Sequence, residues 1–241
     1  MTNLQGQVAI VTGGGTGIGR GIALALGQAG VKVVVCGRRP DPLNKVVQTI
    51  QTHGGTALAY PIDVAQETEV VQLVKTTLAQ LGRIDILINN AGVFATGYIH
   101  NHTIEAWDRI MAINLRAPFL LARMVLPHMR QQKSGHIINI SSESGIEYEE
   151  NNGAYAVSKH ALNALGQLMQ KENQAYNIRV NTICPGMVVS EMTENDPGLN
   201  LSQCLTPEDI ADLTMWLLSR RTNIKIGTPV LVQTMVNPWE Q

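Results

Sequence analysis

Short apolar runs alternate with longer segments of helical periodicity along the whole chain, and this alternation limits the fold more than any other feature. The apolar runs are rich in Val and Ile, which suits strands buried on both faces of a parallel sheet. The pattern predicts the α/β class, with a single doubly wound parallel β-sheet and helices on both faces. We expect strands at residues 7–12, 32–36, 56–62, 84–89, 136–141, 178–183 and 230–233, and helices at 17–30, 41–51, 66–81, 103–132 (two helices, broken near 116–118), 154–176 and 207–219.

The chain length leaves the number of domains open, because 241 residues suit one α/β domain as well as two small ones. A composition of 44% hydrophobic and 15% charged residues supplies a sizeable core, which argues against disorder. No internal repeat or low-complexity linker divides the sequence. We therefore predict one domain over residues 1–241.

Charge and cysteine content exclude several classes of function. The formal net charge is −1 without a basic stripe, so neither nucleic acid nor an anionic membrane is expected as a partner. Cys36, Cys184 and Cys204 are far apart and odd in number, which argues against a disulfide framework or a metal site and favours the cytoplasm. No catalytic metal is expected. Residues 1–7 lack the layout of a signal peptide, and no apolar run looks long enough to span a bilayer.

A glycine-rich turn, TGGGTGIG at residues 12–19, joins the first expected strand to the first helix. Glycines allow a tight turn and a close approach of a phosphate, and a helix N-terminus offers free N–H groups to it. The spacing of Gly13, Gly17 and Gly19 departs from the common G-x-G-x-x-G pattern. Close helix–strand packing is the alternative explanation, but the position at the first βα junction favours a dinucleotide site.

Six motifs in order along the chain carry a family resemblance that covers nearly its whole length. The chain resembles the short-chain dehydrogenases/reductases, in their compact single-domain branch with a Rossmann-type sheet. The motifs are T-G-x-x-x-G-[IL]-G at 12–19, N-N-A-G at 89–92, Asn114, Ser142, Y-x-x-x-K at 155–159 and P-G at 185–186.

The resemblance implies a catalytic set of Asn114, Ser142, Tyr155 and Lys159. Tyr155 and Lys159 are four residues apart and share one helix face, so the ammonium should lower the pKa of the phenol toward the working range. By the resemblance, Tyr155 exchanges the proton with the substrate oxygen, Ser142 hydrogen-bonds that oxygen, Lys159 also holds the nicotinamide ribose, and Asn114 supports a water next to Lys159. Ser141 remains the alternative to Ser142 as the serine that hydrogen-bonds the substrate oxygen. The alternative to a catalytic Tyr155–Lys159 pair is an exposed pair on the surface of a helix.

The cofactor is expected to be NADP(H) rather than NAD(H). Gly37 stands where NAD-preferring relatives have an acidic residue, and Arg38 and Arg39 follow it. Arg can grip a 2′-phosphate, and Arg38 should carry most of the preference; a solvated basic turn is the alternative. The implied cofactor-binding residues are Gly13, Thr16, Gly17, Ile18, Arg38, Arg39, Asp63, Val64, Asn90, Ala91, Gly92, Tyr155, Lys159, Pro185, Gly186, Val188 and Ser190.

Three segments depart from the family pattern. The segment after the P-G motif, residues 191–206, is short, which suggests a reduced lid and an open pocket, and residues 230–241 lack the usual D-G-G. The loop between Ser142 and Tyr155 has no basic residue, and its negative field should repel anions and attract cations, unless the acidic side chains form only a solvated rim. The acidic residues of this loop are Glu143, Glu147, Glu149 and Glu150.

These features favour an enzyme that transfers a hydride between NADP(H) and a carbonyl or alcohol substrate, a neutral or amine-bearing ketone or aldehyde. A 3-oxoacyl-carrier-protein reductase is an alternative. A non-catalytic dinucleotide-binding sensor or assembly subunit on the same fold is another. The long helix after Asn114 and the helix that carries Tyr155 are rich in Leu, Ala and Met, which together with the resemblance predicts a homodimer or homotetramer.

Overall fold

The computed structural model describes residues 2–191, 193–194 and 198–239. Seven parallel strands form one sheet in the order β3-β2-β1-β4-β5-β6-β7. The strands are β1 (Val8–Thr12), β2 (Lys32–Gly37), β3 (Ala57–Pro61), β4 (Ile86–Asn89), β5 (Gly135–Ile140), β6 (Ile178–Pro185) and β7 (Val230–Val232). The α-helices are α1 (Gly17–Gln28), α2 (Pro40–Thr52), α3 (Glu67–Leu81), α4 (Ile104–Met111), α5 (Ala117–Gln132), α6 (Gly153–Asn173) and α7 (Pro207–Ser219).

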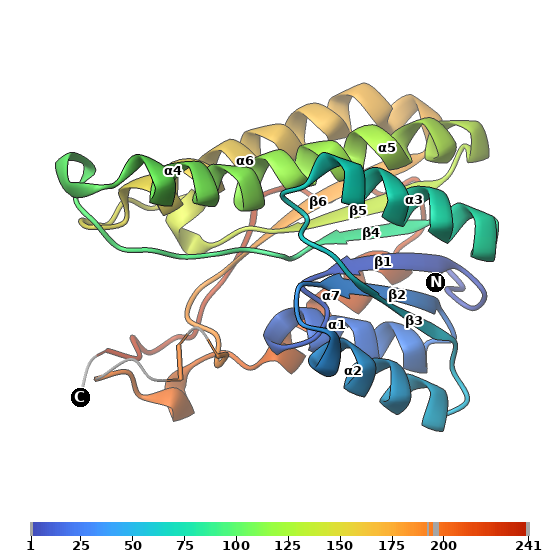
Figure 1. The fold of residues 1–241 in the computed structure, drawn as a ribbon, viewed down its shortest axis with the longest axis horizontal. Helices are drawn as coiled ribbons and strands as arrows, with labels where there is room; N and C mark the ends of the chain where they lie inside the picture. Colours follow the sequence, from blue (N-terminus) through green and yellow to red (C-terminus); the bar gives the residue numbers. More distant parts are fainter. Residues whose placement is uncertain (1, 192, 195–197, 240–241) are drawn as a thin grey trace.

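Helices cover both faces of the sheet because successive strand residues point to opposite sides. Ala9 and Val11 of β1 join the apolar core under α1, α2 and α7, whereas Ile10 joins the core under α3, α5 and α6. Figure 1 shows these two helical layers above and below the strands. The expected doubly wound α/β fold is therefore confirmed, and its inner strands are buried on both sides, whereas the edge strands β3 and β7 are only partly buried.

The long helical stretch is continuous, so the break predicted near residues 116–118 is wrong. Helix α4 passes through a π-helical turn, Ala112–Arg116, directly into α5. The N–H of Ala117 bonds to the carbonyl of Ala112, five residues back. Pro118 lies in the first turn of α5, directly after this wider turn, where its missing N–H and its ring are tolerated.

The same helix, Ile104–Gln132, also corrects the expectation that no apolar run could span a bilayer. By length and composition alone its 29 residues could do so, with a mean hydropathy of 1.4 in its most apolar window. Half of that window is buried inside the protein, and α5 packs against α3, α6 and β5. The core helix of a soluble protein has the same properties.

The order of the strands reverses between β1 and β4. From β1 the chain winds outward to β2 and β3 and then returns to β4 on the other side of β1. In such sheets ligands bind beyond the carboxyl ends of the strands at this switch point. The loops after β1 and β4 therefore define where a site should lie.

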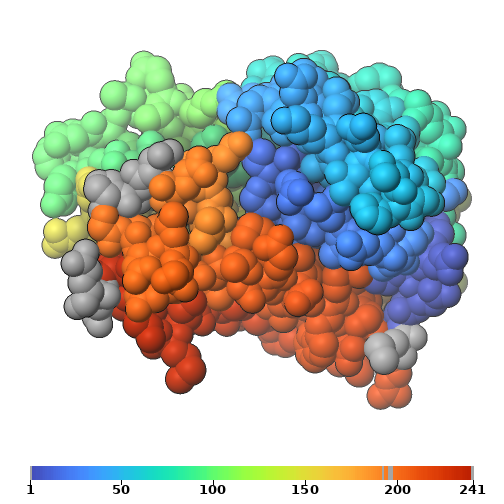
Figure 2. Space-filling view, turned by 90° about the horizontal axis from the view of Figure 1, so that it is seen from below, coloured from blue at the N-terminus to red at the C-terminus, as the bar shows by residue number. Residues whose placement is uncertain are grey.

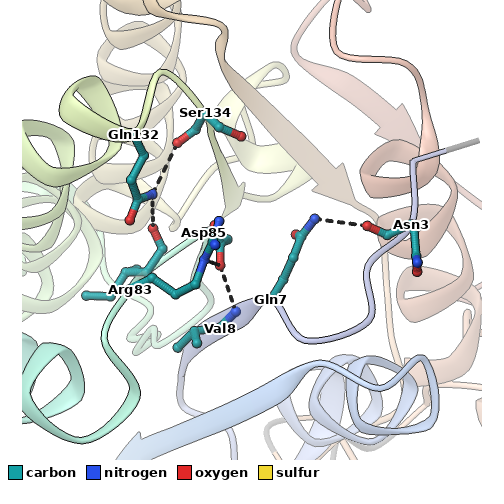
Figure 3. A network of polar contacts seen from close by, with 8 residues as sticks. Asn3, Gln7, Val8, Arg83, Asp85, Gln132 and Ser134 are labelled. Carbon is teal, nitrogen blue, oxygen red and sulfur yellow. Dashed lines mark hydrogen bonds and ion pairs between the residues drawn. The ribbon is translucent and has the colours of Figure 1, made fainter.

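Hydrogen bonds and an ion pair connect the chain segments at the opposite, amino-terminal edge of the sheet (Figure 3). The buried carboxylate of Asp85 accepts hydrogen bonds from the Val8 N–H at 2.9 Å and from Arg83 Nε at 2.8 Å. Gln132 Nε2 donates to the Ile84 carbonyl at 3.0 Å. These bonds join β1, β4 and the end of α5 at one edge.

We predict that Asp85→Ala lowers the free energy of unfolding by about 2 kcal/mol, because the buried Val8 N–H loses its acceptor. Urea unfolding measures the change. The control is Gln7→Ala at the same edge, which removes only an exposed bond to the Asn3 carbonyl and should change the free energy by less than about 0.5 kcal/mol. Equal effects of the two substitutions would contradict this account of the edge.

Candidate active site

A cleft of about 850 Å³ lies at the carboxyl ends of the strands. Every residue predicted to bind the cofactor lines it, and so do Ser142, Tyr155 and Lys159; of the predicted site residues Asn114 is the exception. The cofactor set that lines the cleft is Gly13, Thr16, Gly17, Ile18, Arg38, Arg39, Asp63, Val64, Asn90, Ala91, Gly92, Tyr155, Lys159, Pro185, Gly186, Val188 and Ser190.

The glycine-rich turn leaves room for a phosphate at the N-terminus of α1. Gly13 has a φ of +62°, and a Cβ there would stand 2.9 Å from Asn90 Nδ2. A Cβ on Gly19 would collide with the Gly13 carbonyl and with Asn90. The first turn of α1 has no acidic side chain, so its free N–H groups and its dipole are available to an anion. These features fit the pyrophosphate of a dinucleotide.

The loops after β1 and β4 are tied together through Thr12 and Asn90. Thr12 Oγ1 accepts hydrogen bonds from the N–H groups of Asn90 and Ala91, both at 2.9 Å. Asn90 Nδ2 donates to the Thr12 carbonyl at 2.9 Å. This two-way pairing fixes both loops at the switch point and so shapes the middle of the cleft.

The two arginines after β2 have different surroundings. Arg39 forms an ion pair with Glu191 at 2.5 Å, between the start of α2 and the segment after β6. The exposed Arg38 side chain also lines the cleft, and no hydrogen bond or ion pair of its guanidinium is found with the described residues. Of these two arginines, Arg38 is therefore the one whose guanidinium is available to bind a phosphate.

Tyr155 and Lys159 project from the first turns of α6 into the cleft. The Lys159 ammonium lies over the Tyr155 ring, 5.4 Å from its centroid, and donates to the Ile140 carbonyl at 3.0 Å. Phe94 packs its ring edge-to-face against Tyr155 at 4.9 Å between centroids. These contacts hold the phenol and the ammonium at the end of β5.

The two neighbouring serines after β5 differ in orientation. The Ser142 side chain hydrogen-bonds with Tyr155, and it accepts from the Ser144 N–H at 3.2 Å. Buried Ser141 instead donates to the Lys159 carbonyl at 3.2 Å. This geometry favours Ser142 over Ser141 as the hydroxyl next to the reacting centre.

Asn114 lies in the π-helical turn behind the cleft and is buried. Its Oδ1 accepts from the Val93 N–H, and its Nδ2 donates to the Val93 carbonyl, both at 2.9 Å, and to Ser158 Oγ at 3.1 Å. The side-chain amide thus joins the loop after β4 to helix α6. Its contacts position the neighbours of Tyr155.

Burial dominates the acid–base properties of the Tyr155–Lys159 pair. It raises the pKa of Tyr155 to about 12, and it lowers the pKa of Lys159 to about 8. The expected lowering of the phenol pKa is therefore not found: removal of the phenolate from water is the largest cause, and Lys159 is not among the groups that shift the pKa of Tyr155. At neutral pH Tyr155 is a protonated phenol, the form that can donate a proton.

The sequence did not single out Phe94, Met187 or Trp239, which also line the cleft. Trp239 was not expected, because residues 230–241 lack the usual D-G-G, and this departure put a cover from the end of the chain in doubt. The Asn200 N–H donates to the Pro238 carbonyl at 2.9 Å, which joins that segment to the residues before α7. Figure 2 shows the red carboxyl-terminal segment beside the orange one. Residues 192 and 195–197 of the shortened segment lie outside the described residues.

The signal for Phe94 was its position two residues after the N-N-A-G motif, where the chain leaves the end of β4. Met187 directly follows Pro185 and Gly186 in the same way. Trp239 has no local signal, because its place depends on how the end of the chain packs.

Comparison with known proteins agrees with the strand order, which defines a Rossmann-type protein. The short chain dehydrogenase family model matches residues 7–198. The chain is 37% identical over 228 residues to an uncharacterized oxidoreductase of Staphylococcus saprophyticus, covering 94% of this chain and 97% of that one. The chain belongs to the short-chain dehydrogenase/reductase family of oxidoreductases.

Two solved structures are similar over almost the whole length. A metagenomic short-chain oxidoreductase in complex with NADP is 34% identical, with a TM-score of 0.84 and coverage of 97% of this chain and 98% of that one. Levodione reductase is 30% identical, with a TM-score of 0.89 and coverage of 95% and 96%. Both likenesses cover the sheet and the cleft.

Proposed function

We propose that the protein reduces the carbonyl group of a small molecule, or oxidises the matching alcohol, with NADP(H). The observation that carries this proposal is the position of the Tyr155 phenol, which lines the cleft together with Ser142 and has the Lys159 ammonium over its ring. A protonated donor at the end of a dinucleotide cleft is what carbonyl reduction needs.

Each of these side chains has one main part in the proposed reduction. Tyr155 Oη donates its proton to the carbonyl oxygen, and Ser142 Oγ hydrogen-bonds the same oxygen. Lys159 holds the ribose next to the nicotinamide, and the N-terminus of α1 and Arg38 hold the phosphates. NADPH, when bound, supplies the hydride to the carbonyl carbon.

NADP(H) rather than NAD(H) is proposed because Gly37 leaves no carboxylate at the end of β2 and Arg38 follows it. The metagenomic relative, whose structure is a complex with NADP, supports the same choice.

The substrate is proposed to be a neutral or amine-bearing ketone or aldehyde. Glu143, Glu149 and Glu150 line the cleft, and no ion pair of theirs is found within the part of the chain that the structure describes. Their charge disfavours anionic substrates and acidic acyl carriers. This argues against a 3-oxoacyl-carrier-protein reductase. The presence of Ser142, Tyr155 and Lys159 in one cleft argues against a non-catalytic sensor.

A carbonyl panel tests the proposal by the loss of NADPH absorbance. Neutral and amine-bearing ketones should be reduced, with larger kcat/KM values than acyl thioesters. NADPH binding without turnover of any compound would instead favour the sensor.

We also propose a homodimer or homotetramer, with a contact through α5 and α6. Phe119 of α5 and Val157 and Leu168 of α6 are exposed apolar side chains on these helices. Sedimentation should detect a particle larger than the 26.2 kDa chain, and a monomer at micromolar concentration would contradict the proposal.

A further inference from the structure

Glu143 differs from the three other glutamates of its loop. It directly follows Ser142, lines the cleft and is half-buried. Glu149 and Glu150 also line the cleft but are exposed, and Glu147 is exposed and does not line it. Glu143 is therefore the acidic side chain of this loop that lies deepest, next to the proposed reacting centre.

Its carboxylate is held from two sides. Gln233, just after β7, donates from Nε2 to Glu143 Oε2 at 2.9 Å. The same oxygen stands 2.9 Å from where a Cβ on Gly186 would lie, so the carboxylate lies against the turn after β6. Glu143 thus lies where the ends of β5, β6 and β7 meet.

The charge of Glu143 has no cation beside it within the described residues: no Lys, Arg or His nitrogen lies within 4 Å of its carboxylate there. Burial raises the pKa of Glu143, the hydrogen bond from the neutral Gln233 side chain lowers it, and the charges of Glu149 and Glu147 raise it. Removing a carboxylate from water without a counter-ion costs free energy. A positive group of a ligand would offset that cost.

Glu143 lines the same cleft as Tyr155 and directly follows Ser142 in the chain, so its carboxylate belongs to the same part of the site as the reacting centre. Any substrate whose carbonyl oxygen meets Tyr155 and Ser142 is therefore close to Glu143 as well. We propose that Glu143 is the specificity-determining residue of the site, and that it binds a positively charged nitrogen a few bonds away from the carbonyl of the substrate. This inference rests on the proposed carbonyl reduction and narrows its substrates to amine-bearing carbonyl compounds.

Two ketones of the same shape test the proposal, one with a trimethylammonium group and one with a tert-butyl group in its place. The measurement is the ratio of their kcat/KM values, cationic over neutral, from NADPH oxidation. We expect a ratio of about tenfold or more for the wild type, and a ratio near one for Glu143→Gln, which keeps the size and an acceptor for Gln233.

Glu147→Gln is the matched control, because this side chain belongs to the same loop but does not line the cleft, and the ratio should be kept. Gln233→Ala is a second variant that leaves the charge but releases the carboxylate, and it should lower the ratio partway. NADPH fluorescence titration of each variant should give a Kd within about twofold of the wild type, which separates a local effect from misfolding.

The outcomes separate this inference from the proposed function. Reduction of the neutral ketone with a wild-type ratio of one or below would overturn the role of Glu143 and leave carbonyl reduction standing. An unchanged ratio in Glu143→Gln would overturn it too. Turnover of neither ketone nor any other carbonyl would contradict both.

Discussion

Tyr155→Phe is expected to lower kcat for carbonyl reduction by about 10³-fold and to leave the Kd for NADPH within about twofold. The substitution keeps the ring and its edge-to-face contact with Phe94 but removes the transferable proton. Steady-state kinetics and NADPH fluorescence titration measure the two quantities. Since burial raises the pKa of Tyr155 to about 12, the wild-type phenol is protonated at pH 7, where the comparison is made.

Tyr148→Phe is the control for this substitution, because Tyr148 is 83% exposed and stacks on His160 outside the cleft. It should keep kcat within about twofold. Lys159→Ala should weaken NADPH binding and lower the rate with it, because the ammonium that holds the ribose next to the nicotinamide is lost. Near-normal turnover of Tyr155→Phe would mean that another group is the acid.

The double substitution Gly37→Asp with Arg38→Ala is expected to reverse the cofactor preference from NADPH to NADH. Among the described residues other than its chain neighbours, a Cβ at Gly37 would meet no atom closer than Leu43 Cδ2 at 3.8 Å, so the end of β2 has room to begin a side chain there, and an Asp carboxylate at this position is the group that accepts from a ribose 2′-hydroxyl. Loss of the Arg38 guanidinium removes charge-assisted bonds to a 2′-phosphate, which are worth about tenfold to hundredfold in affinity. The ratio of kcat/KM for NADPH and NADH measures the change.

Arg39→Ala tests whether the effect belongs to Arg38. Arg39 is already paired with Glu191, so its removal should change the NADPH preference less than Arg38→Ala does. A wild type that prefers NADH would refute the NADP(H) proposal outright. If Arg39→Ala lowered the NADPH preference more than Arg38→Ala does, the 2′-phosphate would instead be bound at the start of α2.

The strands, their helices and most of the cleft could be predicted because they depend on local patterns. Runs of Val and Ile mark the strands, and parallel strands bring their carboxyl ends to one edge. Gly13, Asn90 and Pro185 each come at or just after the end of a different strand, so their meeting in one cleft follows from the topology. The six sequence motifs then identify the family.

Features that depend on solvent exposure or on distant packing could not be predicted. Helical spacing places Tyr155 and Lys159 on one face, but it does not reveal that burial is the largest cause of the pKa shift of each. Pro118 suggested a break because the π-helical turn before it has no local signal. Trp239 reaches the cleft only through the packing of the chain end.

The polar contacts around Asp85 lie at one edge of the sheet and the cleft at the other. Substitutions among Asp85, Arg83 and Gln132 should therefore shift the melting temperature with little effect on kcat, whereas changes in the loops after the strands should alter selectivity with little loss of heat resistance. Thermal stability and substrate selectivity can then be engineered independently in this protein, the first at the amino-terminal edge of the sheet and the second at the carboxyl-terminal edge. Asp85→Ala with a lower melting temperature and a normal kcat, measured below that temperature, would demonstrate this independence. A decrease in kcat that parallels the decrease in melting temperature would contradict it.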